Sequence, residues 1–286
     1  MTLRKNFGKI KRKIQHSIND HKQLSQLLKK INTDLMDNIN QLSIKSKFPT
    51  LRICGNGNSL AEMDSNNSYD YLVVNFCVKS ELFFTIKPRY YVVIDEVPFN
   101  DEKFFNSMLV PISEQVTWEM FFFTREKFRN DKLEKLFQKN KNIHLVYWNC
   151  YPVQDLSENN RFYCYDHNLG IPCVENVMVA AIYLGIMLKY PTIELYGVNH
   201  DWTKYLFVDK DNFVRMYDRH FYETSQPTSI VFEYEPGVPI KMYQIMEMFA
   251  HIFKAYTDLQ QLAIKHNVSV INHTKESFID AFKRYE

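Results

Sequence analysis

The sequence predicts an α/β fold: a Rossmann-like, mostly parallel sheet with helices on both faces, preceded by a long amphipathic helix. After Pro49, short runs rich in β-branched and aromatic residues alternate with helical patterns, which is typical of parallel sheets. The chain has 286 residues, of which 45% are hydrophobic, so it can bury one large core. We therefore expect an α/β domain over residues 50–286 and a leader over residues 1–46.

The leader combines a basic tip with a heptad pattern. Six basic residues precede the first acidic residue, Asp20, and such a tip either lies on an anionic membrane surface or stays solvated and disordered. From Ile10 to Leu42, apolar residues recur at alternating spacings of four and three, which predicts one long helix. That helix either pairs with a second copy of the chain or folds back on the body. Because no tight turn precedes Pro49, the pattern favours a homo-oligomer.

Seven strands are expected, because seven apolar runs rich in β-branched and aromatic residues each end in polar residues. They span residues 50–57, 69–76, 89–96, 116–124, 142–148, 192–200 and 267–274. Three longer segments predict helices over residues 126–140, 174–190 and 240–266. Ligands of such sheets bind beyond the carboxyl ends of the strands, so the polar strand ends should line a crevice: Asn56, Asn75, Asp95, Asn199 and Asn272.

Two short motifs stand at these strand ends. Gly55-Asn56-Gly57-Asn58-Ser59 follows the first strand in a chain with only 7 Gly, which marks a constrained turn. It has neither the GxGxxG pattern nor a P-loop Lys, so a turn without a ligand and a phosphate-holding loop both remain open. His200-Asp201-Trp202 directly follows another apolar strand, and this arrangement indicates the edge of a site.

Composition argues against several classes of protein. No apolar run reaches the roughly 18 residues that a membrane-spanning helix needs, and the amino terminus lacks the apolar segment of a secretory signal. A cytoplasmic location is therefore expected. The 5 Cys residues lack CxxC spacing, which argues against a disulfide framework or a metal site. The formal net charge of +2 leaves no extended basic track, so nucleic acid is not an expected partner.

The order of the motifs resembles the bacterial sialyltransferases of glycosyltransferase family 42. The wider group includes the flagellin-modifying Maf proteins and the 6-hydroxymethylpterin diphosphokinase-like proteins. The likeness covers residues 51–282. It rests on a first strand ending in Gly-Asn-Gly-x-Ser-Leu, a second ending at Asn75, and a third ending at Asp95. "NVMVAAIYLGIMLKY" and "TIELYGVNHDW" resemble the group's small-residue helix and next strand, and "VSVINHTKESFIDAF" its closing strand, turn and short helix. The resemblance implies a sialyltransferase-like variant of the GT-A fold.

The resemblance also implies a site. Together with the strand ends and the start of the small-residue helix, it predicts nucleotide contacts from Gly55, Asn56, Gly57, Ser59, Asn75, Asp95, Asn176 and Asn272. Three histidines are candidates for the general base: His167 by gap-free counting, His200 by the Gly-x-x-His-x-Trp pattern, and His220 in a lid over residues 203–239. Acceptor contacts are expected from Asn199, Asp201, Trp202, Arg219 and Tyr222. Phosphate contacts are expected from Tyr147, Tyr151, Tyr163 and Tyr165. Two positions depart from the group: Asp95 replaces Asn, and Asn199 replaces Asp.

The implied activity is transfer of a sugar, such as a nonulosonic acid from its CMP donor, onto a surface glycan or its lipid-linked precursor. No metal or other cofactor is implied. The reaction needs a base that takes the acceptor proton, and a neutral His is suited to this task. Two alternatives remain from the same motifs: a pyrophosphokinase of the 6-hydroxymethylpterin type, and a non-catalytic scaffold that pairs through its leader.

Overall fold

The computed structural model describes residues 19–42, 48–66, 68–218, 228–235 and 237–285. Its main element is an eight-stranded sheet of order β13-β12-β6-β1-β2-β3-β4-β5, in which neighbouring strands are parallel. The prediction of an α/β fold with a mostly parallel sheet is confirmed, and each of the seven expected strands is present. The strands are β1 (Thr50–Cys54), β2 (Asp70–Val74), β3 (Tyr90–Val93), β4 (Met120–Arg125), β5 (Ile143–Trp148), β6 (Thr192–Tyr196), β12 (Ser269–Asn272) and β13 (Lys283–Arg284).

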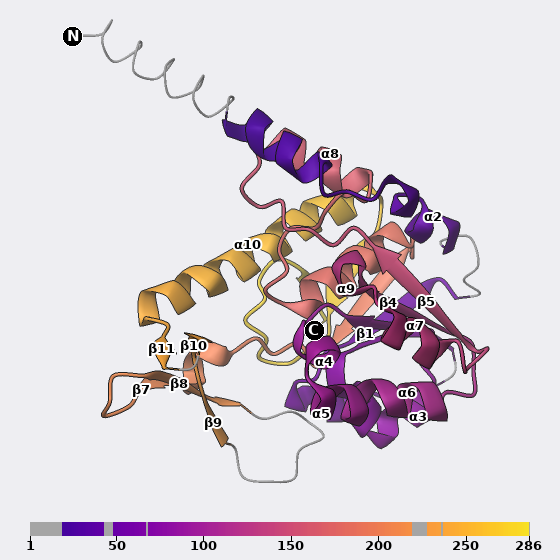
Figure 1. The fold of residues 1–286 in the computed structure, drawn as a ribbon, viewed down its shortest axis with the longest axis horizontal. Helices are drawn as coiled ribbons and strands as arrows, with labels where there is room; N and C mark the ends of the chain where they lie inside the picture. Colours follow the sequence, from indigo (N-terminus) through magenta and orange to yellow (C-terminus); the bar gives the residue numbers. More distant parts are fainter. Residues whose placement is uncertain (1–18, 43–47, 67, 219–227, 236, 286) are drawn as a thin grey trace, which may run out of the picture.

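Helices cover both faces of the sheet (Figure 1). One face carries α8 (Glu158–Asp166), α9 (Val177–Met187), α10 (Met242–Lys265) and the leader. The other face carries α3 (Glu81–Ile86), α6 (Val110–Gln115) and α7 (Asp131–Phe137). Shorter elements connect them: η2 (Asn58–Glu62), η3 (Asn75–Lys79), α4 (Val97–Asn100), α5 (Glu102–Phe104), the π-helix η4 (Phe105–Leu109) and η5 (Glu126–Phe128).

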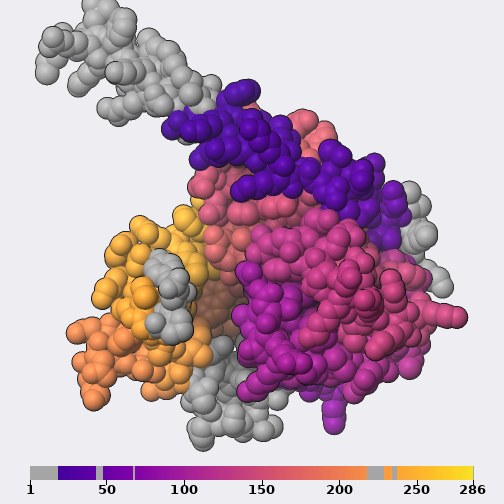
Figure 2. Space-filling model, viewed as in Figure 1, coloured from indigo at the N-terminus to yellow at the C-terminus, as the bar shows by residue number. Residues whose placement is uncertain are grey.

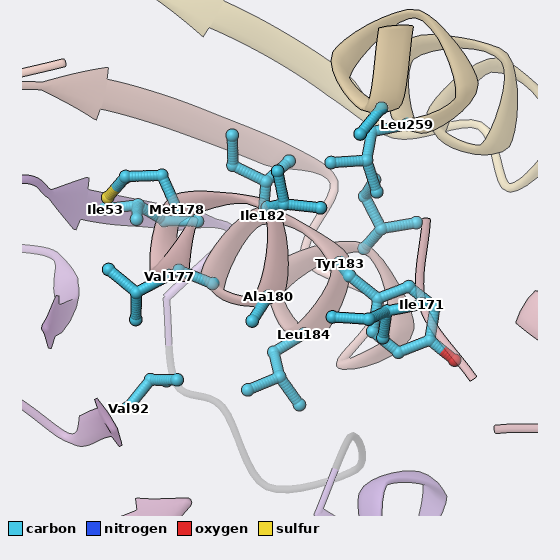
Figure 3. Packing of buried hydrophobic residues seen from close by; sticks show 14 of the residues in the cluster. Ile53, Val92, Ile171, Val177, Met178, Ala180, Ile182, Tyr183, Leu184 and Leu259 are labelled. Carbon is cyan, nitrogen blue, oxygen red and sulfur yellow. The ribbon is translucent and has the colours of Figure 1, made fainter. Parts of the chain in front are cut away.

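The central helix is α9, and all 11 of its residues are buried. Figure 3 shows Val177, Met178 and Ile182 among residues from the neighbouring strands and from α10. A Cβ atom at Gly185 would lie 2.9 Å from Ile193 Cδ1 and 3.1 Å from Leu51 Cδ2, so the missing side chain lets the helix approach the sheet. A helix that is apolar all round is stable only when covered on every side, which α10 and the sheet do. This explains why the segment carries so few polar residues.

The leader does not form the single helix expected over residues 10–42. Within the described part, residues 19–28 are helical, a turn follows at Lys29-Lys30, and η1 (Thr33–Leu35) and α2 (Asn38–Leu42) complete it. Leu27 and Ile39 are buried in the same core as the sheet, and Leu24 packs against it. The described part of the leader is therefore folded onto the α/β body.

Polar contacts with distant residues explain where the leader bends. The Asn149 side chain bonds to both backbone groups of Asn32: its Oδ1 accepts from Asn32 N (3.1 Å) and its Nδ2 donates to the Asn32 carbonyl (2.9 Å). Asn38 Nδ2 donates to the carbonyl of Tyr147 (2.9 Å). Asn side chains that bond outside a helix compete with helix continuation. Residues 1–18, including the basic tip, lie outside the described residues, and self-association through the leader stays a prediction.

The expected lid over residues 203–239 contains more structure than a loop. After η6 (Trp202–Tyr205), three antiparallel strands form a small sheet: β7 (Leu206–Val208), β8 (Val214–Asp218) and β9 (Thr228–Val231). A two-stranded pair follows, β10 (Glu233–Glu235) with β11 (Val238–Pro239). We call these five strands the arm. Figure 2 shows a hollow between the orange and yellow surface of the arm and α10 and the purple and magenta surface opposite, where Figure 1 labels α4.

Three further findings complete the fold. The closing segment after β12 contains turns and β13, so the short helix that the resemblance implied there is absent from residues 275–282. The five cysteines are free and buried. Among the described helices, none is both long and apolar enough to cross a membrane.

Candidate functional site

The sheet changes direction of winding between β1 and β6. From β1, the strands run in sequence order through β2, β3, β4 and β5 on one side, while β6, β12 and β13 lie on the other. Ligands of doubly wound sheets bind at such a switch point, outside the carboxyl ends of the strands. The loops that follow β1 and β6 therefore lie where a ligand is expected.

These two loops are packed directly against each other. Gly55 N donates to the carbonyl of Tyr196 (2.8 Å), and Gly57 N donates to that of Gly197 (2.9 Å). A Cβ atom at Gly55 would lie 2.4 Å from Gly197 O, closer than real contacts allow. Ser59 Oγ also donates to Asn199 Oδ1 (2.8 Å), which joins two predicted site residues to each other. Contact between the loops thus accounts for the glycines of the opening motif.

Unpaired polar atoms mark the rest of the carboxyl edge. Eight buried side-chain N or O atoms of the described residues have no hydrogen-bond partner, and seven of them lie within two residues of the carboxyl end of a main-sheet strand. Native proteins pair about 90% or more of their buried polar atoms, so this concentration indicates a place for a ligand or ordered water. The seven atoms are Asn56 Oδ1, Asn75 Oδ1, Thr124 Oγ1, Arg125 Nε, Tyr147 Oη, Trp148 Nε1 and His273 Nε2.

Asn56 and Asn75 lie at this edge, as the sequence predicted. Asn56 Nδ2 donates to the carbonyl of Val74 (3.3 Å), which orients the amide and leaves Oδ1 free. Asn75 has a φ of 47°, a left-handed conformation that few residues other than Gly adopt. Its carbonyl accepts a hydrogen bond from the Tyr91 hydroxyl, which holds the backbone in this conformation. Strain of this kind is typical of functional positions.

Asp95 follows β3 and completes this part of the edge. The residue is exposed to solvent, but enough protein atoms lie around its carboxylate to remove part of the hydration of that group. The surrounding protein desolvates the carboxylate and raises its pKa above the ordinary value, while a hydrogen bond from Asn75 and the charge of Arg125 oppose the shift. A carboxyl group with a raised pKa in a concave place is a candidate acid or base.

His200 lies in a buried contact chain. Its Nε2 is 2.6 Å from the Tyr256 hydroxyl, which is 3.4 Å from Asn176 Oδ1. Asn176 Oδ1 also accepts from Met178 N (2.8 Å) and so caps the start of α9. Burial lowers the pKa of His200 to about 3. A general base works best with a pKa near the operating pH, so this geometry favours a positioning role for His200.

His167 does not join the cluster. It is exposed, caps the end of α8, and stacks on Tyr163 with ring centroids 4.2 Å apart. Its neighbour Asp166 pairs with Lys265, which lies about 14 Å farther along α10 than Tyr256. Counting without gaps along the chain placed this residue at the crevice, but α8 directs it to the outer surface beside the carboxyl end of α10. His220, Arg219 and Tyr222 lie outside the described residues.

Several other predicted site residues make internal contacts. Asn272 is 1% exposed, donates to Ser277 Oγ (3.0 Å) and accepts from Thr274 N (3.0 Å), so it stabilises the turn after β12. Asp201 pairs with Lys204 (3.3 Å), and Trp202 packs on His200 and Phe249.

Of the four predicted phosphate tyrosines, two bond to atoms of a helix or of the leader. Tyr165 Oη donates to Asp258 Oδ2 (2.8 Å), and Tyr151 Oη donates to the carbonyl of Lys30 (3.0 Å). Tyr163 is half exposed beside His167, and Tyr147 is at the carboxyl end of β5.

Three residues of the edge were not expected from the sequence: Thr124, Arg125 and Trp148. Thr124-Arg125 ends a strand that otherwise reads Met-Phe-Phe-Phe, and that abrupt change to polar residues was the available signal. No sequence signal marked Trp148, because an apolar run ending in Trp is typical of any buried strand. Within the described residues, no group of three or more His, Cys, Asp or Glu side chains is arranged to hold a metal ion.

No family model, curated protein or solved structure matches the chain. The fold and the edge therefore define the class on their own: an α/β protein with a Rossmann-like sheet whose carboxyl edge carries unpaired polar groups.

Proposed function

We propose that the chain is a glycosyltransferase of the sialyltransferase-like kind, which binds a nucleotide sugar along the carboxyl edge of the sheet. The observation that supports this most is the row of unpaired buried polar atoms at that edge. Asn56 and Asn75 belong to it, and they are the residues to which the resemblance assigns the nucleotide. We take the donor to be a CMP-linked nonulosonic acid and the acceptor to be a bacterial surface glycan or its lipid-linked precursor.

The edge offers suitable groups for a nucleotide. The free Oδ1 atoms of Asn56 and Asn75 can accept from ribose hydroxyls or from the exocyclic amine of a base. The end of α9 leads to the beginning of β6, so the start of α9, which Asn176 caps, lies toward the carboxyl edge of the sheet. The amide groups at a helix start favour a phosphate.

Sugar transfer also needs a group that takes the proton of the acceptor hydroxyl. Among the described residues, Asp95 has the properties required: its carboxylate reaches solvent, and its pKa is raised toward the working range of a base. We therefore assign Asp95 as the general base in place of His167 and His200. The departing phosphate then needs hydrogen-bond donors, which the amide groups at the start of α9 supply.

A thermal-shift screen of CMP, CDP, UDP, GDP and ATP tests the proposal. A ligand at 100 times its Kd stabilises the folded chain by about 2.7 kcal/mol, which corresponds to about 5 °C or more for a chain of this size. We expect CMP to give the largest shift, and CMP-linked sugar to be slowly hydrolysed when no acceptor is present. Stabilisation by ATP alone, with Mg²⁺-dependent diphosphate transfer, would instead identify the pyrophosphokinase. A chain that responds to no nucleotide would be the scaffold.

A further inference from the structure

The unpaired atoms of the carboxyl edge are hydrogen-bond acceptors at β1 and β2 and include hydrogen-bond donors at β4 and β5. At β1 and β2 they are the acceptors Asn56 Oδ1 and Asn75 Oδ1. Both amides are oriented by contacts of their other atoms, with Val74 and Asp95 respectively. At β4 and β5 they include Arg125 Nε and Trp148 Nε1, which can only donate. A ligand that satisfies the whole edge must therefore carry donors at one end and acceptors at the other.

The two donors are neighbours. Arg125 and Trp148 are register partners on adjacent parallel strands, so their side chains leave the same face of the sheet. Trp148 is 1% exposed and stacks on Tyr183 of α9, with ring centroids 5.7 Å apart. Arg125 is only partly exposed, and no ion pair joins it to a carboxylate among the described residues. Arg129, four residues later, contrasts with it, since Arg129 pairs with Glu126 (3.0 Å) and Glu134 (3.3 Å).

Burying Arg125 Nε without a partner is costly, because this N–H group has lost water without gaining an acceptor. An indole N–H buried without an acceptor carries a smaller cost of the same kind. Both costs are removed when an anionic oxygen binds between them. Arg is also the side chain whose fork of donors best matches carboxylate and phosphate groups.

We infer that Arg125 and Trp148 form an anion subsite, which binds an acidic oxygen of the ligand while Asn56 and Asn75 bind its hydroxyl or amino groups. The acidic oxygen belongs to a phosphate or to a carboxylate. The inference extends the proposed function by orienting the ligand along the edge, but binding of an anion there does not require sugar transfer.

Asp95 is the competing partner for Arg125. The charge of Arg125 acts on the Asp95 carboxylate, yet the two groups form no ion pair within the described residues. If the Arg125 guanidinium binds an anion of the ligand, the Asp95 carboxylate repels that anion. Replacing Asp95 by Asn should then strengthen anion binding.

The indole N–H groups provide a direct readout by ¹⁵N NMR of the full chain. The protein has 3 Trp, so three indole signals are expected. Trp118 Nε1 already donates to the carbonyl of Pro88 (2.9 Å) and serves as the internal reference. Trp148→Phe keeps an aromatic ring, removes the donor and assigns the signal. The probes are inorganic phosphate and acetate, titrated separately at constant ionic strength.

We expect the Trp148 signal to move saturably with at least one of the two anions, while the Trp118 signal stays in place. The anion that acts distinguishes a phosphate from a carboxylate. Arg125→Gln should weaken the apparent affinity by about tenfold or more, as expected for a charged hydrogen bond. Arg129→Gln removes an equal charge nearby and should change the apparent affinity for the anion by less than about twofold. Asp95→Asn should strengthen it.

The inference is overturned if neither anion moves the Trp148 signal, or if Arg125→Gln and Arg129→Gln have equal effects. An unchanged Trp118 signal in Arg125→Gln shows that the variant is folded. The proposed function can fail separately: anion binding without any nucleotide response would contradict the glycosyltransferase, and a CMP response without anion binding would contradict the subsite.

Discussion

The two ends of the carboxyl edge are built differently. At the β1–β6 end, backbone hydrogen bonds join Gly55 and Gly57 to the opposite loop, and side-chain contacts join Ser59 to Asn199. At the β3–β5 end, Arg125 and Trp148 have polar atoms without partners, and Asp95 has a raised pKa. The end with the more recognisable motif is thus held together internally. The end that reads as plain apolar strands carries the unpaired donors Arg125 Nε and Trp148 Nε1, while at the other end Asn56 Oδ1 stays free within the motif.

We infer that residues of the loop junction mainly stabilise the fold, whereas the residues with unpaired atoms mainly serve binding. A satisfied loop junction stabilises the fold, and changes there should unfold the protein before they affect chemistry. Unpaired buried groups destabilise the fold, and they persist where binding compensates for them. Changes at the β3–β5 end should therefore lower activity at little cost in stability.

The largest effect is expected at Asp95. Asp95→Asn removes the proposed base, and losing a general base typically costs about 10² to 10⁴ in rate. The nucleotide should still bind. Steady-state kinetics with donor and acceptor saturating would measure the loss in kcat. Full kcat in this variant would mean that Asp95 is not the general base and that one of the histidines is.

The same substitution should change stability with pH in a defined direction. Because the folded-state pKa of Asp95 is raised, the folded chain holds this proton more tightly than the unfolded chain, and stability falls as pH rises through that range. Asp95→Asn removes this penalty. It should therefore raise the free energy of unfolding at pH 7 and leave it unchanged below the ordinary Asp pKa. Urea titrations at both pH values would test the sign.

The next largest effect tests the β1–β6 end. Gly55→Ala puts a Cβ atom 2.4 Å from the backbone oxygen of Gly197, and a backbone atom cannot move aside as a flexible side chain can. We expect a loss of about 3 kcal/mol in the free energy of unfolding. Asn58→Ala, at an exposed position of the same loop, is the matched control. Equal stabilities for both variants would show that the loops are not held in contact.

A smaller effect is expected at the ends of β1 and β2. Asn56→Ala and Asn75→Ala remove the free acceptors, so each should weaken nucleotide binding by about tenfold. The fold should survive, because both residues follow strands and lie outside the apolar core. Calorimetric titration of the nucleotide into each variant gives the affinity. Unchanged affinity in both variants would remove the nucleotide assignment.

The strands and long helices were predictable because their signals are local. Each of the seven strand runs carries its own β-branched and aromatic residues, and α9 and α10 carry long apolar patterns. The short helices α3 to α6 were not predicted, since segments of that length are stabilised by packing and not by propensity. The position of Asn56 and Asn75 at the carboxyl edge followed from topology alone.

What the sequence could not show depends on contacts between distant residues. The bend in the leader rests on bonds from Asn32 and Asn38 to residues more than 100 positions away. Arg125 and Trp148 stand out only because their partners are missing, which no pattern of residue types records. The burial of His200 against Tyr256 likewise joins two separate elements.

The smallest effect is expected at His167, which belongs to neither end of the edge. The residue is exposed, and Asp166 beside it pairs with the carboxyl end of α10, so its ring lies on the outer surface. Surface substitutions of this kind usually change stability by less than about 0.5 kcal/mol. His167→Ala should therefore keep kcat and nucleotide affinity. A hundredfold loss in kcat with unchanged affinity would mean that this side chain reaches the acceptor. Activity would then depend on a site that includes the surface of α8, and the carboxyl edge alone would not account for the chemistry.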